Sequence, residues 1–92
     1  MAKNDPEEAW AAYVVEVGLR LNRFRHAAGL SQETLANRVG ITRNHYQLLE
    51  KGKSTPTKVA NPQLRVMVAL AEVLGVDLTE LLPPAAGVAV GG

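Results

Sequence analysis

Residues 31–52 read SQETLANRVGITRNHYQLLEKG and have the apolar spacing of two short helices joined by a tight turn. Ser31 is a preferred N-cap residue, so the first helix is expected to begin at Gln32. Gly40 follows at the point where a left-handed residue ends a helix at least cost. Thr42 is expected to cap the second helix in the same way as Ser31 caps the first. This stretch therefore predicts two capped helices around a glycine turn.

The second of these helices has a buried side and an outward side at 100° per residue. Tyr46 and Leu49 fall on the side of Thr42 and are expected in the core. Arginine can pair with guanine, asparagine and glutamine with adenine, and an apolar side chain can contact the thymine methyl group. We therefore interpret the outward side as a base-reading surface for double-stranded DNA rather than an ordinary solvated helix face. It carries Arg43, Asn44, Gln47 and Leu48.

From Val17 to Leu82 the chain resembles the phage Cro/repressor-type helix-turn-helix regulators, also called the xenobiotic response element family. The resemblance is carried by LRLNRFRHAAGLSQETLA, by the Gly40 turn, by LLEKGK and by NPQLRVMVALAEVLGVDLTELL. It implies five helices, of which the second and third form the helix-turn-helix. The expected fold is an all-α, five-helix repressor-like helix-turn-helix domain with an extended N-terminal helix. This domain is expected over residues 1–82, with a flexible apolar tail at 83–92.

The same resemblance implies roles for individual residues. Gln32 is similar to the family residue that contacts the DNA backbone and braces the recognition helix, and Arg25 and Glu50 resemble an internal ion pair between the first and third helices. Leu48, where relatives are often polar, favours methyl contact or packing. The link after the third helix is longer than in the family, so residues 54–60 are expected to form a long loop. Further backbone contacts are expected from Thr42, His45, Lys51, Lys53 and Lys58.

Positive charge is concentrated in the middle of the chain. Nine of the ten lysine and arginine residues lie between residues 20 and 65, where Glu33 and Glu50 are the only acidic residues. The overall net charge of +1 conceals this asymmetry. A positive field centred on the base-reading surface is what binding to a phosphate backbone requires.

Several other classes of protein are disfavoured by the sequence. It has no cysteine, and its two histidines, His26 and His45, have no accompanying cluster of metal ligands. No glycine-rich phosphate loop or nucleophile motif is present. There is also no signal peptide and no apolar run of membrane length. We expect a cytoplasmic protein that is not an enzyme and uses no cofactor, metal or membrane.

The N-terminal helix is expected to begin after Asp5, a capping residue followed by Pro6, and to run to about Ala28. The portion that resembles the family begins only near Val17, so about two additional turns precede it. Their apolar residues are expected either to cover the last helix or to meet a second subunit. The candidate contacts of a homodimer, including two outward valines of the fourth helix, are Trp10, Tyr13, Val14, Val66 and Val73.

Two further helices are expected near the C-terminus. Asn61 and Pro62 are expected to begin the fourth, which ends at Gly75. Asp77 and Glu80 form a capping-box pattern for a short fifth helix. The buried side of the fourth helix is expected to consist of Leu64, Met67, Leu70, Ala71 and Leu74.

These patterns predict a sequence-specific transcriptional regulator, a repressor that binds a palindromic operator as a homodimer through the major groove. Two alternatives share the same fold. One is a DNA-binding antitoxin that also masks a toxin as its protein partner, and the other is a protein-interaction adaptor that keeps the helix-turn-helix as a scaffold. The positive middle segment argues against the adaptor.

Overall fold

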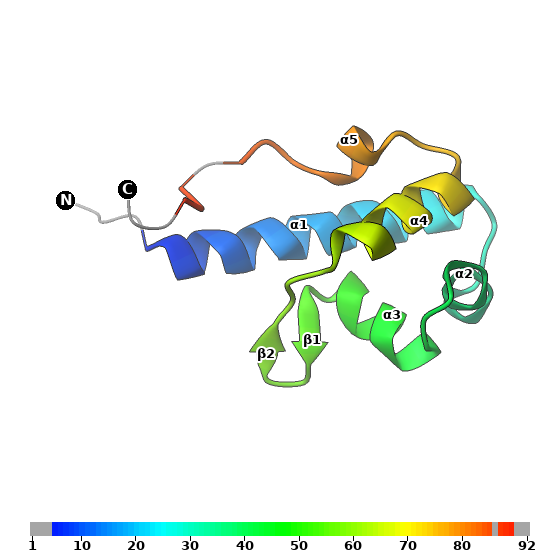
Figure 1. The fold of residues 1–92 in the computed structure, drawn as a ribbon, viewed down its shortest axis with the longest axis horizontal. Coiled ribbons are helices and arrows are strands. Elements are labelled where there is room, and N and C mark those ends of the chain that lie inside the picture. Colours follow the sequence, from blue (N-terminus) through cyan, green and yellow to red (C-terminus); the bar gives the residue numbers. More distant parts are fainter. Residues whose placement is uncertain (1–4, 86, 90–92) are drawn as a thin grey trace.

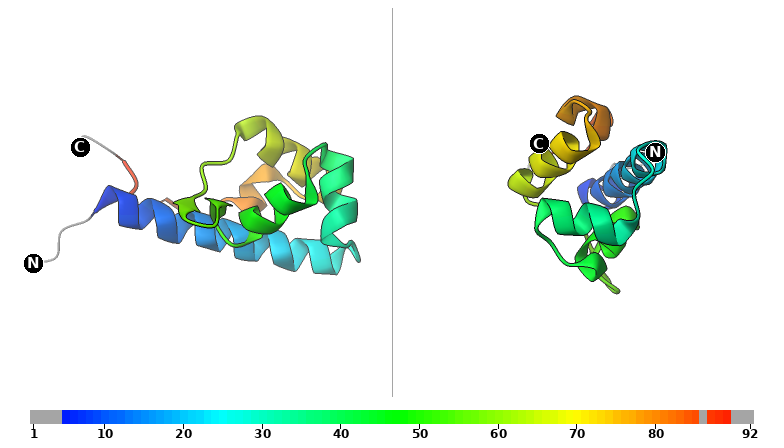
Figure 2. Two further views of the ribbon diagram at one scale, coloured as in Figure 1. Left: turned by 90° about the horizontal axis from the view of Figure 1, so that it is seen from below. Right: turned by 90° about the vertical axis from the view of Figure 1, so that its right-hand side faces the viewer.

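A computed structural model describes residues 5–85 and 87–89, and within them it contains five helices and one β-hairpin (Figure 1). The elements are α1 (Pro6–Ala27), α2 (Gln32–Val39), α3 (Arg43–Glu50), β1 (Lys53–Thr55), β2 (Lys58–Val59), α4 (Leu64–Leu74) and α5 (Leu78–Leu81). The predicted five-helix repressor-like fold is confirmed. The long α1 separates two sides of the domain, with α5 on one side and α3 and the hairpin on the other (Figures 1 and 2).

The ends of α1 follow from local sequence signals. The Asp5 carboxylate accepts a hydrogen bond of 2.9 Å from the backbone N–H of Glu7, and Pro6 occupies the first helical position. The helix ends at Ala27, and Ala28 is its C-cap. The predicted start and end of the extended N-terminal helix are therefore confirmed.

Side-chain caps also set the positions of α2 and α3. Ser31 Oγ accepts from the backbone N–H of Thr34 at 3.0 Å, and Thr42 Oγ1 accepts from that of His45 at 3.0 Å. Between the two helices, Gly40 has a φ of 92°, which favours glycine because it has no Cβ. The predicted caps and turn are confirmed, and they fix how α3 leaves α2.

The prediction for the fourth helix is correct at its end and wrong at its start. Helix α4 ends at Gly75, but it begins at Leu64 rather than at Asn61 or Pro62. Leu64 was expected to be buried and is instead 68% exposed, because the first helical position projects beyond the end of the core. The other predicted core residues of this helix are buried or partly buried against the core: Met67, Leu70, Ala71 and Leu74.

The fifth helix is short and capped as expected. Asp77 and Glu80 form the predicted capping box, in which the Asp77 backbone N–H donates to the Glu80 carboxylate at 2.9 Å. Leu81 is fully buried, so a single helical turn is anchored to the core by one side chain.

The segment expected to be a long loop instead forms a β-hairpin. Lys53 pairs with Val59 and Thr55 with Lys58, in an antiparallel register with an irregularity between the two pairs. Every residue from 53 to 59 is exposed. Because neither strand has a buried face, the sequence shows no alternation of apolar and polar residues by which a strand could be predicted.

The core is formed mainly by apolar side chains from α1 to α5. The extra turns of α1 contribute to it, since Val14 is only 2% exposed. Val14 is therefore not available to a second subunit, and its assignment as a dimer contact is wrong, because its side chain already packs inside its own chain. Trp10 and Tyr13 are partly buried against the core, as are Val66 and Val73.

The C-terminal segment runs back toward the start of α1 (Figure 1). Val88 lies with Pro6, Glu7, Trp10 and Asn61 around a hollow of about 320 Å³. The predicted tail covers residues 83–92, of which residue 86 and residues 90–92 lie outside the described residues, as do residues 1–4 of the predicted domain.

Gly18 allows α1 to approach α3, and its replacement by alanine is the first test of this packing. An alanine Cβ at this position would clash with the carbonyl oxygen of Glu50 and lie 2.7 Å from its carbonyl carbon. Gly18→Ala should therefore lower the free energy of unfolding by about 1–3 kcal/mol, although Gly→Ala within a helix is ordinarily stabilising. Urea unfolding measures the change, with Leu19→Ala at an exposed neighbour as control. An unchanged or increased stability of Gly18→Ala would contradict the close approach.

Candidate nucleic-acid interface

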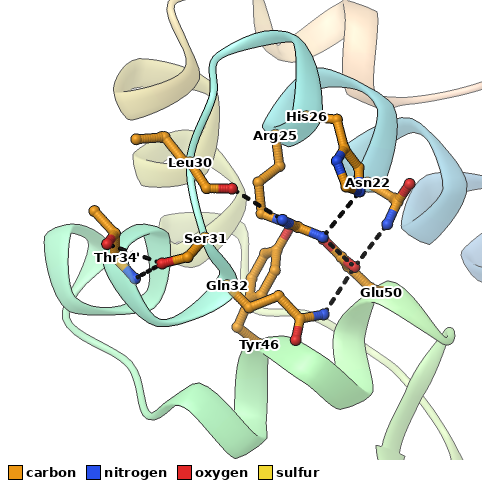
Figure 3. A network of polar contacts seen from close by, with 9 residues as sticks. All are labelled: Asn22, Arg25, His26, Leu30, Ser31, Gln32, Thr34, Tyr46 and Glu50. Atoms are coloured by element: carbon orange, nitrogen blue, oxygen red, sulfur yellow. Dashed lines mark hydrogen bonds and ion pairs between the residues drawn. The ribbon is translucent and has the colours of Figure 1, made fainter.

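A single carboxylate joins the three helices that surround the recognition helix (Figure 3). Glu50, the last residue of α3, forms an ion pair with Arg25 of α1, with 2.7 Å between Arg25 Nε and Glu50 Oε2. Asn22 and Gln32 donate to Glu50 Oε1 at 3.1 and 3.0 Å, and the Tyr46 hydroxyl donates to Oε2. The predicted Arg25–Glu50 ion pair is thus present, and both side chains are buried.

The network determines the charge state of its members. Burial would raise the pKa of Glu50, but the hydrogen bonds from Arg25, Tyr46, Asn22 and Gln32 outweigh it and lower this pKa from 4.5 to about 2. The hydrogen bond to Glu50 raises the pKa of Arg25, and burial raises the pKa of Tyr46. At neutral pH the network therefore holds an ionised Glu50 against a charged Arg25 and a neutral Tyr46.

The outward side of α3 lies opposite this anchoring. Tyr46 and Leu49 are buried, as predicted, whereas Arg43 and Asn44 at the start of the helix are exposed. Gln47 and Leu48, further along, are partly buried. Arg43 and Asn44 thus have the greatest freedom to reach a base edge, since their side chains project from a capped helix start.

Gln32 lies where the first and second of these features meet. Its Nε2 donates to Glu50, and an amide nitrogen carries a second proton that can be donated to a phosphate. Arg43 shares with Gln32 a hollow of about 330 Å³ at the start of α2, which is also lined by Arg25, Ser31 and Glu33. The structure therefore brings together a predicted backbone-contacting residue and a predicted base-contacting residue.

A second hollow, of about 220 Å³, lies between α3 and the hairpin. It is lined in part by His45 and Lys53, both predicted to contact the DNA backbone. Ser54 and Gln63 also line it. These two polar residues were not among the predicted site residues, because nothing in the local sequence indicates that the hairpin returns to α3.

The remaining predicted backbone contacts are separate from these hollows. Thr42 is exposed, and its hydroxyl is already used as the cap of α3. Lys51 is exposed just after α3, and Lys58 is exposed on β2. Lys58 is thus on a protruding hairpin rather than beside the recognition helix.

An apolar groove of about 150 Å³ lies between α1, α4 and α5, and we call it the α1/α4/α5 groove. Two of the predicted dimer contacts, Trp10 and Tyr13, line it with stacked rings whose centroids are 5.4 Å apart. Val66 and Val73 of α4 do not line it. Leu64 does, and Val68, one turn further along α4, is 48% exposed. The lining residues are Trp10, Tyr13, Val14, Val17, Pro62, Leu64, Met67, Leu78 and Leu82.

Two kinds of site were sought in the described part of the chain and not found. No three histidine, cysteine or acidic side chains there are grouped so that they could hold a metal ion. Among the same residues, no helix has both the length and the apolar character needed to cross a membrane.

Comparison with known proteins relates most of the chain to DNA-binding regulators. The sequence profile of a helix-turn-helix domain family matches residues 16–83. An HTH-type transcriptional regulator of Archaeoglobus fulgidus is 37% identical over 62 residues, which are 67% of this chain and 80% of that protein.

Two solved structures are similar in fold and in sequence. The restriction-modification controller protein C.AhdI of Aeromonas hydrophila superposes with a TM-score of 0.68 at 37% identity, over 77% of this chain and 98% of that one. The transcription factor NHTF of Neisseria superposes with a TM-score of 0.64 at 28% identity, over 91% of this chain and 86% of that one.

The lowered pKa of Glu50 predicts how stability depends on pH. The carboxylate is stabilised in the folded state, so its contribution is complete above the unfolded-state pKa and is lost as pH falls from about 4.5 to about 2. Over this interval the wild type should lose on the order of 3 kcal/mol of unfolding free energy more than Glu50→Gln, which cannot titrate at this position. Urea unfolding at a series of pH values measures the difference. Parallel profiles for the two proteins would show that Glu50 is not stabilised by the network.

Proposed function

Because the chain belongs to the helix-turn-helix family of DNA-binding transcriptional regulators, we propose that it is a repressor that occupies a palindromic operator as a homodimer. The strongest support is α3, whose inner side is anchored by Tyr46 and Glu50 while Arg43 and Asn44 remain exposed. Bound at a promoter, such a dimer prevents access of RNA polymerase. This role requires the protein to be in the cytoplasm with the DNA.

The residues of α3 would divide the reading of the operator. A helix in the major groove contacts bases chiefly through residues near its N-terminus. Arg43 would donate two hydrogen bonds to guanine, and Asn44 and Gln47 would pair with adenine. Leu48 would contact a thymine methyl group or pack against the sugar. Direct readout is therefore assigned to these four residues.

Backbone contacts would hold this helix in register. Gln32 would donate its second amide proton to a phosphate while Glu50 keeps the side chain in place. Thr42 and His45 at the start of α3, and Lys51 just after it, would contact phosphates beside the bases that are read. Lys53 and Lys58 would add contacts from the hairpin.

Dimerisation follows from the small size of the reading surface. An eight-residue recognition helix reads only a few base pairs, and a two-fold partner presents a second helix about 34 Å away along the groove. We propose that the α1/α4/α5 groove, together with exposed Leu64 and Val68, meets the same surface of a second copy. This groove has no charged residue in its lining, so a second apolar surface is complementary to it.

A second candidate function comes from C.AhdI, which is named a restriction-modification controller protein and is matched over 98% of its length. We propose as this alternative that the chain controls genes of a restriction-modification pair. Tight binding to the promoter of such a pair in the source genome would support it. An operator found only at unrelated promoters would reject it.

Selection of bound sequences from random duplex DNA tests the main proposal. The expected result is one enriched motif with two-fold symmetry and half-sites about 10 base pairs apart. An adaptor that keeps the helix-turn-helix only as a scaffold would enrich no motif.

Replacement of the two exposed α3 residues should separate base reading from general affinity. Arg43→Ala or Asn44→Ala should cost about 1–3 kcal/mol on the selected operator and relax base preference at one position of each half-site. Arg23→Ala and Asn37→Ala remove the same exposed side chains from α1 and α2 and serve as matched controls. Titration of operator and random duplexes measures both effects. Equal losses of Arg43→Ala on the two duplexes would argue against base reading.

A charge placed in the groove should dissociate the dimer. Leu64→Glu introduces a carboxylate at a residue that is 68% exposed, so the monomer should still fold while apolar contact between copies is lost. Leu19→Glu is the matched control, because Leu19 is 55% exposed on α1 and does not line the groove. Sedimentation at micromolar concentration should give a dimer for the wild type and the control and a monomer for Leu64→Glu. A dimeric Leu64→Glu protein would exclude this surface.

A further inference from the structure

The first turns of α1 contact a part of the domain that is distant in sequence. The match to the helix-turn-helix family begins at residue 16, so residues 6–15 precede it. Within this segment, Trp10 Nε1 donates a hydrogen bond of 2.9 Å to the backbone carbonyl of Ala60, the residue directly after β2. Ala60 is only 2% exposed, so this hydrogen bond satisfies a carbonyl group in a buried residue.

The other end of the hairpin rests on the same segment. Gly52 directly precedes β1, and a Cβ on it would lie 3.0 Å from the backbone nitrogen of Val15. The two ends are also joined, because the Ala60 N–H donates to the Gly52 carbonyl at 2.9 Å. Val15 and Trp10 therefore support the two ends of the hairpin, which has no other strand beside it in the described part of the chain.

The projecting part of the hairpin suits a negatively charged partner. Residues 53–59 are all exposed and include Lys53 and Lys58, three hydroxyl side chains and no acidic residue. The hairpin projects beside α3 on the side of the domain opposite α5 (Figures 1 and 2). A partner that meets the outward side of α3 thus also lies close to these two lysines.

We infer that the hairpin is a second DNA-contacting element, which binds the sugar-phosphate backbone beside the bases read by α3, and that residues 10–15 of α1 hold it in position. This inference rests on the proposed DNA-binding function and adds a determinant outside the helix-turn-helix. Lys53 and Lys58 make the contacts. Trp10 is a positioning residue that acts through Ala60.

The salt dependence of DNA binding tests this arrangement. Trp10→Phe keeps an aromatic ring in the groove but removes the donor to Ala60, so the hairpin should lose its fixed position. The slope of log affinity against log salt concentration should then decrease in magnitude by about one to two units, the value for one or two lost phosphate contacts. Tyr13→Phe, an equally mild change one turn along α1, is the matched control and should keep the wild-type slope.

A double-variant comparison locates the effect in the hairpin. In the background Lys53→Ala/Lys58→Ala, the phosphate contacts are already absent, so Trp10→Phe should change the slope no further. Amide hydrogen exchange without DNA gives a second readout, in which Trp10→Phe should speed exchange of the Ala60 N–H while α2 and α3 keep wild-type rates. All measurements are made well below the melting temperature of each variant.

Three results would overturn the inference while leaving the proposed function intact. The first is a wild-type salt slope in Trp10→Phe, and the second is an equal decrease of the slope in the lysine-free background. The third is a wild-type salt slope in the Lys53→Ala/Lys58→Ala protein. Absence of specific binding by the wild type would instead reject the proposed function itself.

Discussion

The position of the recognition helix depends on the carboxylate of Glu50. This group accepts hydrogen bonds from side chains of α1, α2 and α3, and its negative charge is balanced by Arg25 (Figure 3). The backbone of Glu50 lies against α1 as well, at Gly18, where any side chain would clash. One residue thus fixes both the distance of α3 from α1 and its orientation toward α2, because a buried carboxylate is costly unless all its donors stay in place.

This anchoring separates the domain into surfaces with different roles. Arg43 and Asn44 project from the start of α3, while the apolar α1/α4/α5 groove is formed by other elements. Trp10 connects the groove to the hairpin, since its ring lines the groove and its Nε1 donates to Ala60. The added turns of α1 therefore contribute both to the proposed dimer surface and to the support of the proposed second DNA contact.

What could be predicted from the sequence was encoded locally. Ser31, Gly40 and Thr42 each act on the next few residues, so the caps and the turn of the helix-turn-helix were predicted correctly. The hairpin was missed because its two short strands are exposed on both faces and show no pattern. Leu64 was misplaced because the helix start was assigned three residues too early.

The site itself could be predicted only in part, for a related reason. The Arg25–Glu50 pair was expected from the resemblance to the repressor family, whereas the contributions of Asn22 and Tyr46 to the same carboxylate were not. Asn22 is 28 residues from Glu50, and no spacing rule links side chains across such a distance. Likewise, the return of the hairpin to Trp10 joins residues 50 positions apart.

The most direct test of this account is to map the DNA-binding surface by nuclear magnetic resonance. The ¹⁵N-labelled protein would be titrated with its selected operator, and changes in amide shifts would be compared with those caused by a random duplex at high salt. The account predicts operator-specific changes at residues 42–48 and at Gln32, with no direct effect on α5. Changes concentrated along the α1/α4/α5 groove, with the amides of α3 unaffected, would contradict it.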